Sequence, residues 1–152
     1  EAFLFKYGAA INYDDPGRHD LMMGVGQKLP TAVSIAMAKT LRDNAIDCDA
    51  LGHHSTLTSQ YGVLAMARVH NQNPRTYAEI LASSGEGRKI VRDFAENMAA
   101  VIALAEAGDI HGIEEMIKDS GHYLGERFLK HRMKQAKAVD ALLSDGAMRG
   151  EG

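Results

Sequence analysis

The sequence predicts an all-α protein, and three observations support this prediction. Methionine and alanine are plentiful, aromatic residues make up 6% of the chain and tryptophan is absent, a composition that favours helices over a sandwich or barrel. Apolar residues recur with a helical period from Glu86 to Ala107. Asn73 followed by Pro74 has the form of a helix start, because asparagine caps free amides and proline suits the first turn.

Composition and charge exclude several classes of protein. The 152 residues are enough for one domain, and the net charge of −3 argues against a dedicated binder of nucleic acid or of anionic membranes. No apolar run approaches the roughly 20 residues of a membrane span. A single cysteine, Cys48, excludes an internal disulfide and is typical of a reducing compartment, so a cytoplasmic protein is expected.

The first 13 residues predict a strand from Ala9 to Tyr13, after Gly8. A lone strand needs partners, so this segment is a poor start for an independent domain. The chain also begins at Glu1 rather than at methionine. We therefore expect a processed product or a piece of something longer.

The next signal is Asp15 followed by Pro16, which predicts a capped helix start. The apolar spacing then continues to Leu41, and Pro30 predicts a kinked helix or two helices with a break there. Gly24 and Gly26 lower the helix propensity of this segment. Close packing against another helix would account for both glycines.

Residues 43–54 lack periodicity and predict a loop with a short helical turn near Ala50 and Leu51. Caps within residues 55–58 begin a helix that runs through His70. The helix that starts at Asn73 ends at a Ser83-Ser84-Gly85 break.

The amphipathic helix predicted from Glu86 to Ala107 ends at Gly108, and Asp109 caps the next helix. We predict one last helix from Ile110 to about Leu143, followed by a frayed tail. Such a helix is long for a compact monomer, since 30 helical residues reach about 45 Å.

The chemistry-bearing residues do not form a recognised catalytic or metal signature. The seven histidines lack the spacing of a zinc site, and no nucleophile signature surrounds Cys48. Gly24-Val25-Gly26 lies inside a helix pattern without a third glycine, so it is not a dinucleotide fingerprint. We assign no catalytic, metal-binding or cofactor-binding residue.

Arg88 and Arg92 lie one helical turn apart, and such a pair can bind a carboxylate. The residues alone favour a solvated face that pairs with Glu86 and Asp93. The glycine-containing entry at residues 85–88 can hold an anion or be a plain turn, and its spacing favours the turn. His19 beside Asp20 is either an oriented imidazole or first-turn charge.

Several short motifs occur in an order that carries more information than each motif alone. They are Tyr7-Gly8-Ala9, Pro16-Gly17-Arg18-His19-Asp20, Met23, Gln27 with Leu29, Ala67-Arg68, Asn73-Pro74, Tyr77, Ile80, Ser83-Ser84 and Gly108-Asp109. Over about residues 4–143, this order resembles the C-terminal part of prephenate dehydrogenases.

The resemblance implies a helical bundle, similar to the C-terminal-like domains of 6-phosphogluconate dehydrogenase, with a short N-terminal strand or linker. Residues 1–13 would then be the linker and end of a Rossmann-type domain, and residues 14–145 the helical dimerisation and substrate-side domain. Residues 146–152 would form a disordered tail.

The resemblance also implies a function in tyrosine biosynthesis, the oxidative decarboxylation of prephenate or arogenate. The hydride acceptor, NAD or NADP, would be bound by a Rossmann domain absent from this chain, so the chain alone is expected to be inactive. The implied partners are a second copy in a homodimer, that Rossmann domain and a small aromatic-precursor acid. The implied substrate-binding residues are Arg92, Arg88, Thr31, Gln27 and His19.

Two departures from the family pattern keep an alternative open. Thr31 stands where the family usually has a histidine, and the family's carboxylate-binding arginine falls at or beside Asp93. Both departures favour a non-catalytic, stand-alone helical dimer with a structural or regulatory role. An unrelated all-α ligand binder is a third hypothesis.

Overall fold

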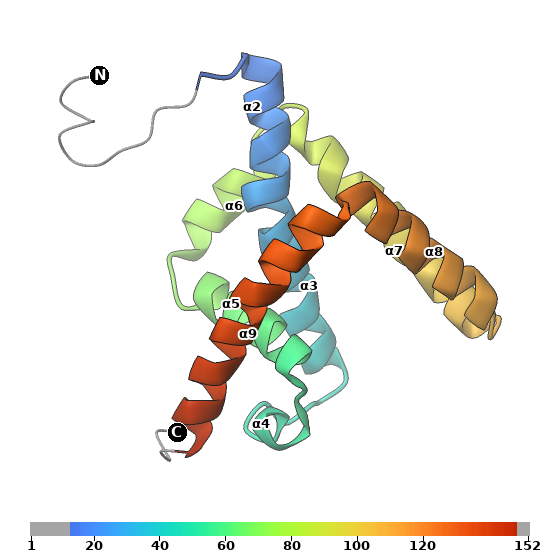
Figure 1. Cartoon of the computed structure of the whole chain (residues 1–152). Helices are drawn as coiled ribbons and strands as arrows, with labels where there is room; N and C mark the ends of the chain where they lie inside the picture. The colour runs from blue at the N-terminus through green and yellow to red at the C-terminus, as the bar shows by residue number, and fades with distance from the viewer. Residues whose placement is uncertain (1–12, 149–152) are drawn as a thin grey trace, which may run out of the picture. The chain divides into compact units, whose positions relative to one another are not determined.

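The computed structural model describes residues 13–148, and all regular structure in this part of the chain is helical (Figure 1). The all-α prediction is therefore confirmed. The predicted strand and linker of residues 1–13 lie outside the described residues, apart from an irregular Tyr13. The elements are α2 (Pro16–Met23), the π-helical turn η1 (Gly24–Lys28), α3 (Leu29–Asp43), α4 (Leu51–His54), α5 (Leu57–His70), α6 (Pro74–Ala82), α7 (Gly87–Glu106), α8 (Ile110–Leu124) and α9 (Glu126–Met148).

The predicted helix starts are confirmed by their side-chain caps. Asp15 accepts from the amide of Arg18 at 3.0 Å, and Thr56 accepts from the amide of Ser59 at 3.2 Å. The other two caps are Asn73 on the amide of Arg75 and Asp109 on the amide of Gly112, at 2.9 and 2.8 Å. Each cap satisfies an amide that has no partner inside its helix.

Helices α2 and α3 are joined without a gap by η1, so the predicted kink or break near Pro30 takes the form of a π-helical turn just before that proline. Pro30 is the second residue of α3 and has no N–H to donate to the preceding turn, and the π-helical turn lies directly before it. The wider π-helical turn spans Gly24–Lys28. Such turns are often found at functional sites, and η1 borders the cleft described below.

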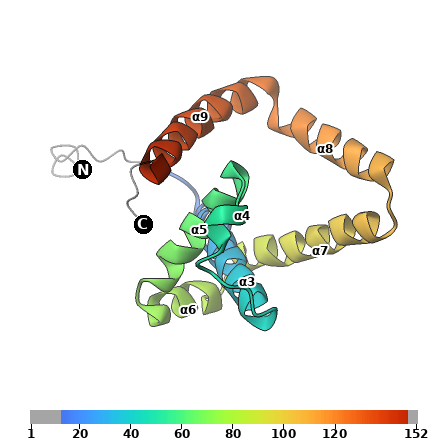
Figure 2. The same cartoon turned by 90° about the horizontal axis from the view of Figure 1, so that it is seen from below.

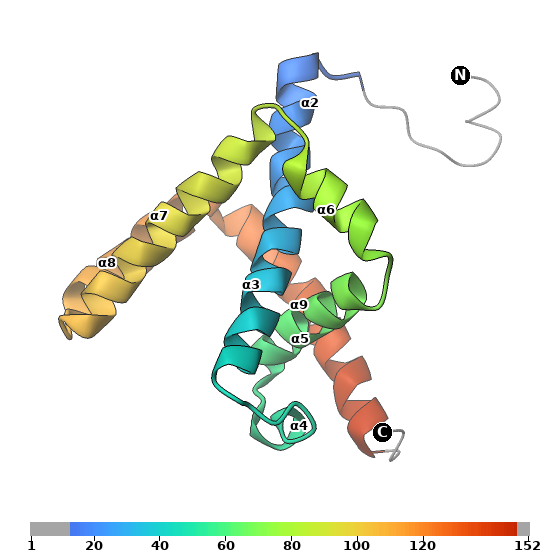
Figure 3. The same ribbon diagram turned by 180° about the vertical axis from the view of Figure 1, so that it is seen from behind.

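The described residues form two compact units, one ending at Glu96 and the other beginning at Asn97. In the first unit, α5 and α6 pack against the η1–α3 segment and against each other (Figure 3). Small and polar residues fill the tightest part of this packing. The buried residues are Gly24, Lys28, Thr31, Ser34 and Gly87.

Gly24 shows why the sequence has a glycine at this point. A Cβ on Gly24 would lie 2.7 Å from the Cα of Gly87, so the two backbones meet where η1 passes the start of α7. The expectation of close helix packing is confirmed for Gly24. It is wrong for Gly26, where a Cβ would meet nothing within 4 Å.

In the second unit, the predicted single helix from Ile110 to about Leu143 is wrong. Helix α8 ends at Leu124, α9 begins at Glu126, and the chain changes direction between them (Figure 2). Gly125, with φ of 78° and ψ of 147°, adopts a conformation that is essentially restricted to glycine. The apolar period continues across the break, which hides it from a periodicity analysis. Helix α9 continues to Met148, past the predicted end.

The second unit has large apolar side chains with no cover. None of its described residues is buried, from Asn97 to the last side chain that the structure describes, and Tyr123 is 90% exposed. The exposed apolar residues of the second unit are Met98, Val101, Ile102, Ile110, Ile117, Tyr123, Leu124, Phe128, Leu129, Met133, Val139 and Leu142.

No described helix combines the length and apolar character required to cross a membrane.

Candidate functional site

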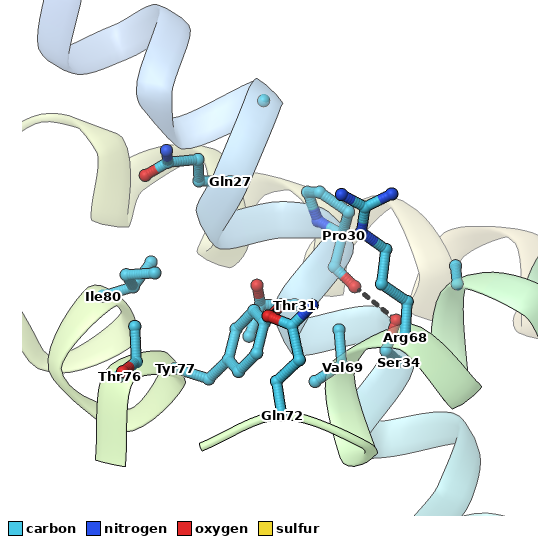
Figure 4. Close-up of a pocket in the computed structure, with 12 residues that line it drawn as sticks. Gln27, Pro30, Thr31, Ser34, Arg68, Val69, Gln72, Thr76, Tyr77 and Ile80 are labelled. Carbon is cyan, nitrogen blue, oxygen red and sulfur yellow. Dashed lines mark hydrogen bonds between the residues drawn. The ribbon is translucent and has the colours of Figure 1, made fainter. Parts of the chain in front are cut away.

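A cleft of about 520 Å³ lies between the η1–α3 segment and the corner that joins α5 to α6 (Figure 4). It is the candidate site of the first unit, because polar side chains from η1, α3, α5 and α6 converge on a largely apolar surface. Its lining residues are Gly26, Gln27, Pro30, Thr31, Ser34, Ala65, Arg68, Val69, Gln72, Thr76, Tyr77 and Ile80.

The first wall is formed by η1 and the first turns of α3. Gln27 and Thr31 are four residues apart, so they lie on the same side of the helical path. Thr31 is 4% exposed and Ser34 is 2% exposed. The Ser34 hydroxyl donates to the carbonyl oxygen of Pro30 at 2.8 Å, which leaves that hydroxyl occupied within its own helix.

The second wall is formed by the end of α5 and by α6. The Asn73 cap turns the chain sharply, so Tyr77 on α6 lies close to Gln72 in the preceding corner. The Tyr77 hydroxyl donates to Oε1 of Gln72 at 3.0 Å. This hydrogen bond holds both side chains at the edge of the cleft.

Arg68 gives the cleft its charge. Among the described residues that line the cleft, Arg68 is the one whose side chain is charged at neutral pH. None of the ion pairs of the described residues involves Arg68. A guanidinium beside hydroxyl and amide groups suits a small organic acid, because the planar fork binds a carboxylate through two hydrogen bonds.

The structure brings together two of the five substrate-binding residues predicted from the sequence. Gln27 and Thr31 both line the cleft, whereas Arg88, Arg92 and His19 do not. The Arg88 guanidinium instead donates to the carbonyl oxygens of Ala82 and Ser83, the latter at 2.9 Å. It therefore holds the end of α6.

Arg92 is exposed on α7, and His19 is exposed on α2. Asp93, beside Arg92, pairs with Lys89 one turn earlier. The start of α7, where the sequence allows an anion site but favours a plain turn, is next to the carboxylate of Asp20. Its Oδ2 accepts from the amide of Gly87 at 3.4 Å.

The sequence analysis missed Arg68 as a site residue. Arg68 belongs to the Ala67-Arg68 motif, but a basic residue in the last turn of a helix is ordinarily explained by the helix dipole. The spacing of Arg68 relative to Gln72 could have indicated that it lines the cleft. Arg68 precedes Gln72 by one turn, at the corner where α5 meets α6. In the described part of the chain, no three His, Cys, Asp or Glu residues form a group that could hold a metal ion.

Comparison with known proteins adds the following findings. The family model described as "Prephenate dehydrogenase, dimerization domain" matches residues 15–119. A protein of Methanocaldococcus jannaschii, described as a probable arogenate/prephenate dehydrogenase, is 24% identical over 143 residues. This match covers 94% of the chain and 32% of the relative, so the chain spans about a third of that relative's length. No solved structure matches the chain.

Proposed function

The chain belongs to the family of prephenate dehydrogenase dimerization domains, and we propose that it is the substrate-side and dimer-forming part of such an enzyme. The complete enzyme would oxidatively decarboxylate prephenate or arogenate and transfer a hydride to NAD or NADP. The observation that supports this proposal most is the cleft, in which Arg68 is the charged group among amide and hydroxyl side chains.

In this proposal the cleft binds and orients a ring acid. The Arg68 guanidinium holds a substrate carboxylate by a charge-assisted, two-point contact. Gln27, Gln72 and Thr76 offer polar side chains to the rest of the substrate, and Ile80 with Val69 offers apolar surface to its ring. Fixing the ring in one orientation is the contribution that such a wall makes to catalysis.

The described residues do not fit a dinucleotide. Gly24-Val25-Gly26 lies inside a continuous helical path rather than after a strand, and Gly24 is packed against the backbone of Gly87. The nicotinamide cofactor would therefore be bound by a Rossmann domain outside this chain, and this chain alone would not turn over substrate.

We further propose that the second unit is completed by a second copy of the chain. The description of the family supports this assembly, and so does the uncovered apolar surface on α8 and α9. Burial of apolar area is the main favourable term in association, and obligate dimers use such surfaces. Light scattering after size exclusion tests the proposal. A dimeric mass is expected, and a monomer over the whole accessible concentration range would contradict it.

The catalytic part of the proposal is tested with a chimera. The chain replaces the matched segment of the Methanocaldococcus jannaschii relative, and prephenate-dependent and arogenate-dependent reduction of NAD and NADP is measured. Turnover with either acid supports the proposal, and a folded chimera that neither turns over nor binds either acid would reject it. That result would favour the non-catalytic, stand-alone helical dimer.

A further inference from the structure

We propose that Lys28 is a positioning residue that fixes the distance between the two walls of the cleft. The proposal rests on the proposed function, in which this cleft binds a small ring acid. Lys28 is 4% exposed and belongs to η1, directly after the cleft residue Gln27. Its side chain does not line the cleft.

The ammonium group of Lys28 is fully engaged by the end of α6. Its Nζ donates to the carbonyl oxygen of Ile80 at 2.5 Å and to that of Ser83 at 3.1 Å. It also donates to the hydroxyl oxygen of Ser83. A lysine has three N–H donors, so these three acceptors leave none for a ligand.

The end of α6 needs such a donor. Its C-cap residue, Ser83, has φ of −57° and ψ of 140°, so the chain leaves the helix extended rather than through a left-handed glycine. The last carbonyl oxygens of α6 are therefore met by side chains, one of them the Ser83 hydroxyl, which donates to the carbonyl oxygen of Ile80 at 2.9 Å. Lys28 supplies a buried cation at the negative end of the helix dipole, and Arg88 supplies an exposed one.

This contact links the two walls directly. Gln27 and Thr31 on one wall flank Lys28 in the sequence, while Ile80, which accepts its hydrogen bond, lines the other wall. If α6 moved away from η1, the ammonium would stay in a buried position without acceptors, which is strongly unfavourable. The bond therefore holds Thr76, Tyr77 and Ile80 at a set distance from Gln27 and Thr31.

The roles of Lys28 and Arg68 can be separated by the charge of the ligand. Arg68 lines the cleft and would contact a carboxylate, so its loss should matter more for an acid with more carboxylates. Lys28 has no donor to offer a ligand, so its loss should weaken acids with one and with two carboxylates by a similar factor. A difference in charge dependence thus distinguishes positioning from direct binding.

The experiment measures binding of two probes to the 152-residue chain by calorimetry. The probes are prephenate, which has two carboxylates, and 4-hydroxyphenylpyruvate, which has one. Lys28→Met removes the ammonium and keeps an unbranched stem, and we expect about tenfold weaker binding of both probes. Arg68→Met should weaken prephenate binding more than binding of the monocarboxylate. Lys39→Met, on an exposed lysine of α3 that pairs with Asp43, should change neither affinity.

A second measurement reports the position of α6 without any ligand. The chain is labelled with 3-fluorotyrosine, and the fluorine resonance of Tyr77 is assigned with a Tyr77→Phe variant. Lys28→Met should shift or broaden this resonance, whereas Lys39→Met should leave it unchanged. Ser83→Ala removes one of the three acceptors of Lys28 together with the hydrogen bond from the Ser83 hydroxyl to Ile80, and it should produce a smaller change of the same kind.

Chemical rescue completes the test. In a Cys48→Ser background, Lys28→Cys is alkylated with 2-bromoethylamine in urea and refolded, which restores an ammonium on a side chain of nearly the same length. We expect recovery of both affinities and of the Tyr77 resonance. Rescue also decides the case in which Lys28→Met fails to fold, because a refolded, alkylated chain with wild-type binding supports the proposal.

The proposal is overturned if Lys28→Met leaves both affinities and the Tyr77 resonance unchanged. It is equally overturned if the variant lowers only the melting temperature while binding remains at the wild-type level. If the wild-type chain binds neither probe, the proposed function loses its support. The fluorine resonance of Tyr77 then still decides whether Lys28 positions α6.

Discussion

Gly24 of η1 and Gly87 of α7 meet backbone to backbone, at a separation that leaves no room for a Cβ on either residue. A Cβ on Gly24 would lie 2.7 Å from the Cα of Gly87, and one on Gly87 would lie 2.9 Å from the carbonyl oxygen of Asp20. Backbone atoms cannot rotate away as a flexible side chain can. The crossing therefore requires glycine at both positions.

Gly24→Ala should lower the free energy of unfolding by about 1–3 kcal/mol, the usual cost of forcing extra atoms into packed structure. The measurement is urea denaturation followed by circular dichroism. Gly26→Ala is the matched control in the same turn, since its Cβ would meet nothing within 4 Å. That control should be neutral or stabilising by up to about 1 kcal/mol. Equal effects of the two substitutions would contradict the backbone contact.

Gly125→Ala should destabilise the junction of α8 and α9. Gly125 has φ of 78° and ψ of 147°, a region that costs a residue with a Cβ about 1–3 kcal/mol. Hydrogen exchange of the amides in α8 and α9 would locate the effect. Gly121→Ala, inside α8 and with open space for its Cβ, is the control and should slow exchange in α8. A Gly125→Ala chain as stable as wild type would argue for a continuous helix.

Arg68→Met should weaken prephenate binding by at least tenfold, because hydrogen bonds to charged groups contribute roughly 1.5–3 kcal/mol. The melting temperature should change little, since Arg68 is exposed and has no ion pair among the described residues. Arg92→Met is the informative comparison, because the family resemblance implies Arg92 as a substrate-binding residue. If Arg92→Met abolishes binding and Arg68→Met does not, the cleft is not the acid site.

The pKa of Asp43 should lie below the ordinary value for aspartate, about 3.9. The hydrogen bond from Lys39 is the larger cause and that from Arg42 the smaller, since both favour the carboxylate form. A lowered folded-state pKa contributes stability above the unfolded-state pKa, and this contribution is lost as the pH falls through the folded-state value. Its window is therefore acidic, below about pH 4.

Carbon-detected NMR titration of Asp43 gives this pKa directly. Lys39→Met should raise it toward the ordinary value, and added salt should do the same because the pair is exposed. Lys89→Met removes a comparable exposed partner from Asp93 and should leave the pKa of Asp43 unchanged. An unshifted Asp43 in the wild-type chain would contradict the contact with Lys39.

Local signals determined most of the helices. Three helix starts could be predicted to within a few residues, at Asp15-Pro16, at Asn73-Pro74 and at Asp109. A capping side chain bonds an amide only two or three positions away, so it marks the start locally. The order of the short motifs also predicted the family, which the family model confirms over residues 15–119. These features need no contact between distant parts of the chain.

Tertiary structure alone decided the break at Gly125, the burial of Lys28 and the place of Arg68 in the cleft. The apolar period runs unchanged through Gly125, so periodicity could not reveal the turn. A lysine in a helical segment is ordinarily exposed, and Lys28 is buried only because residues 52 and 55 positions later supply its acceptors. Helix caps and apolar periodicity depend on residues that are close in the sequence. A buried cation and a cleft depend on which helix ends, distant in the sequence, meet in space.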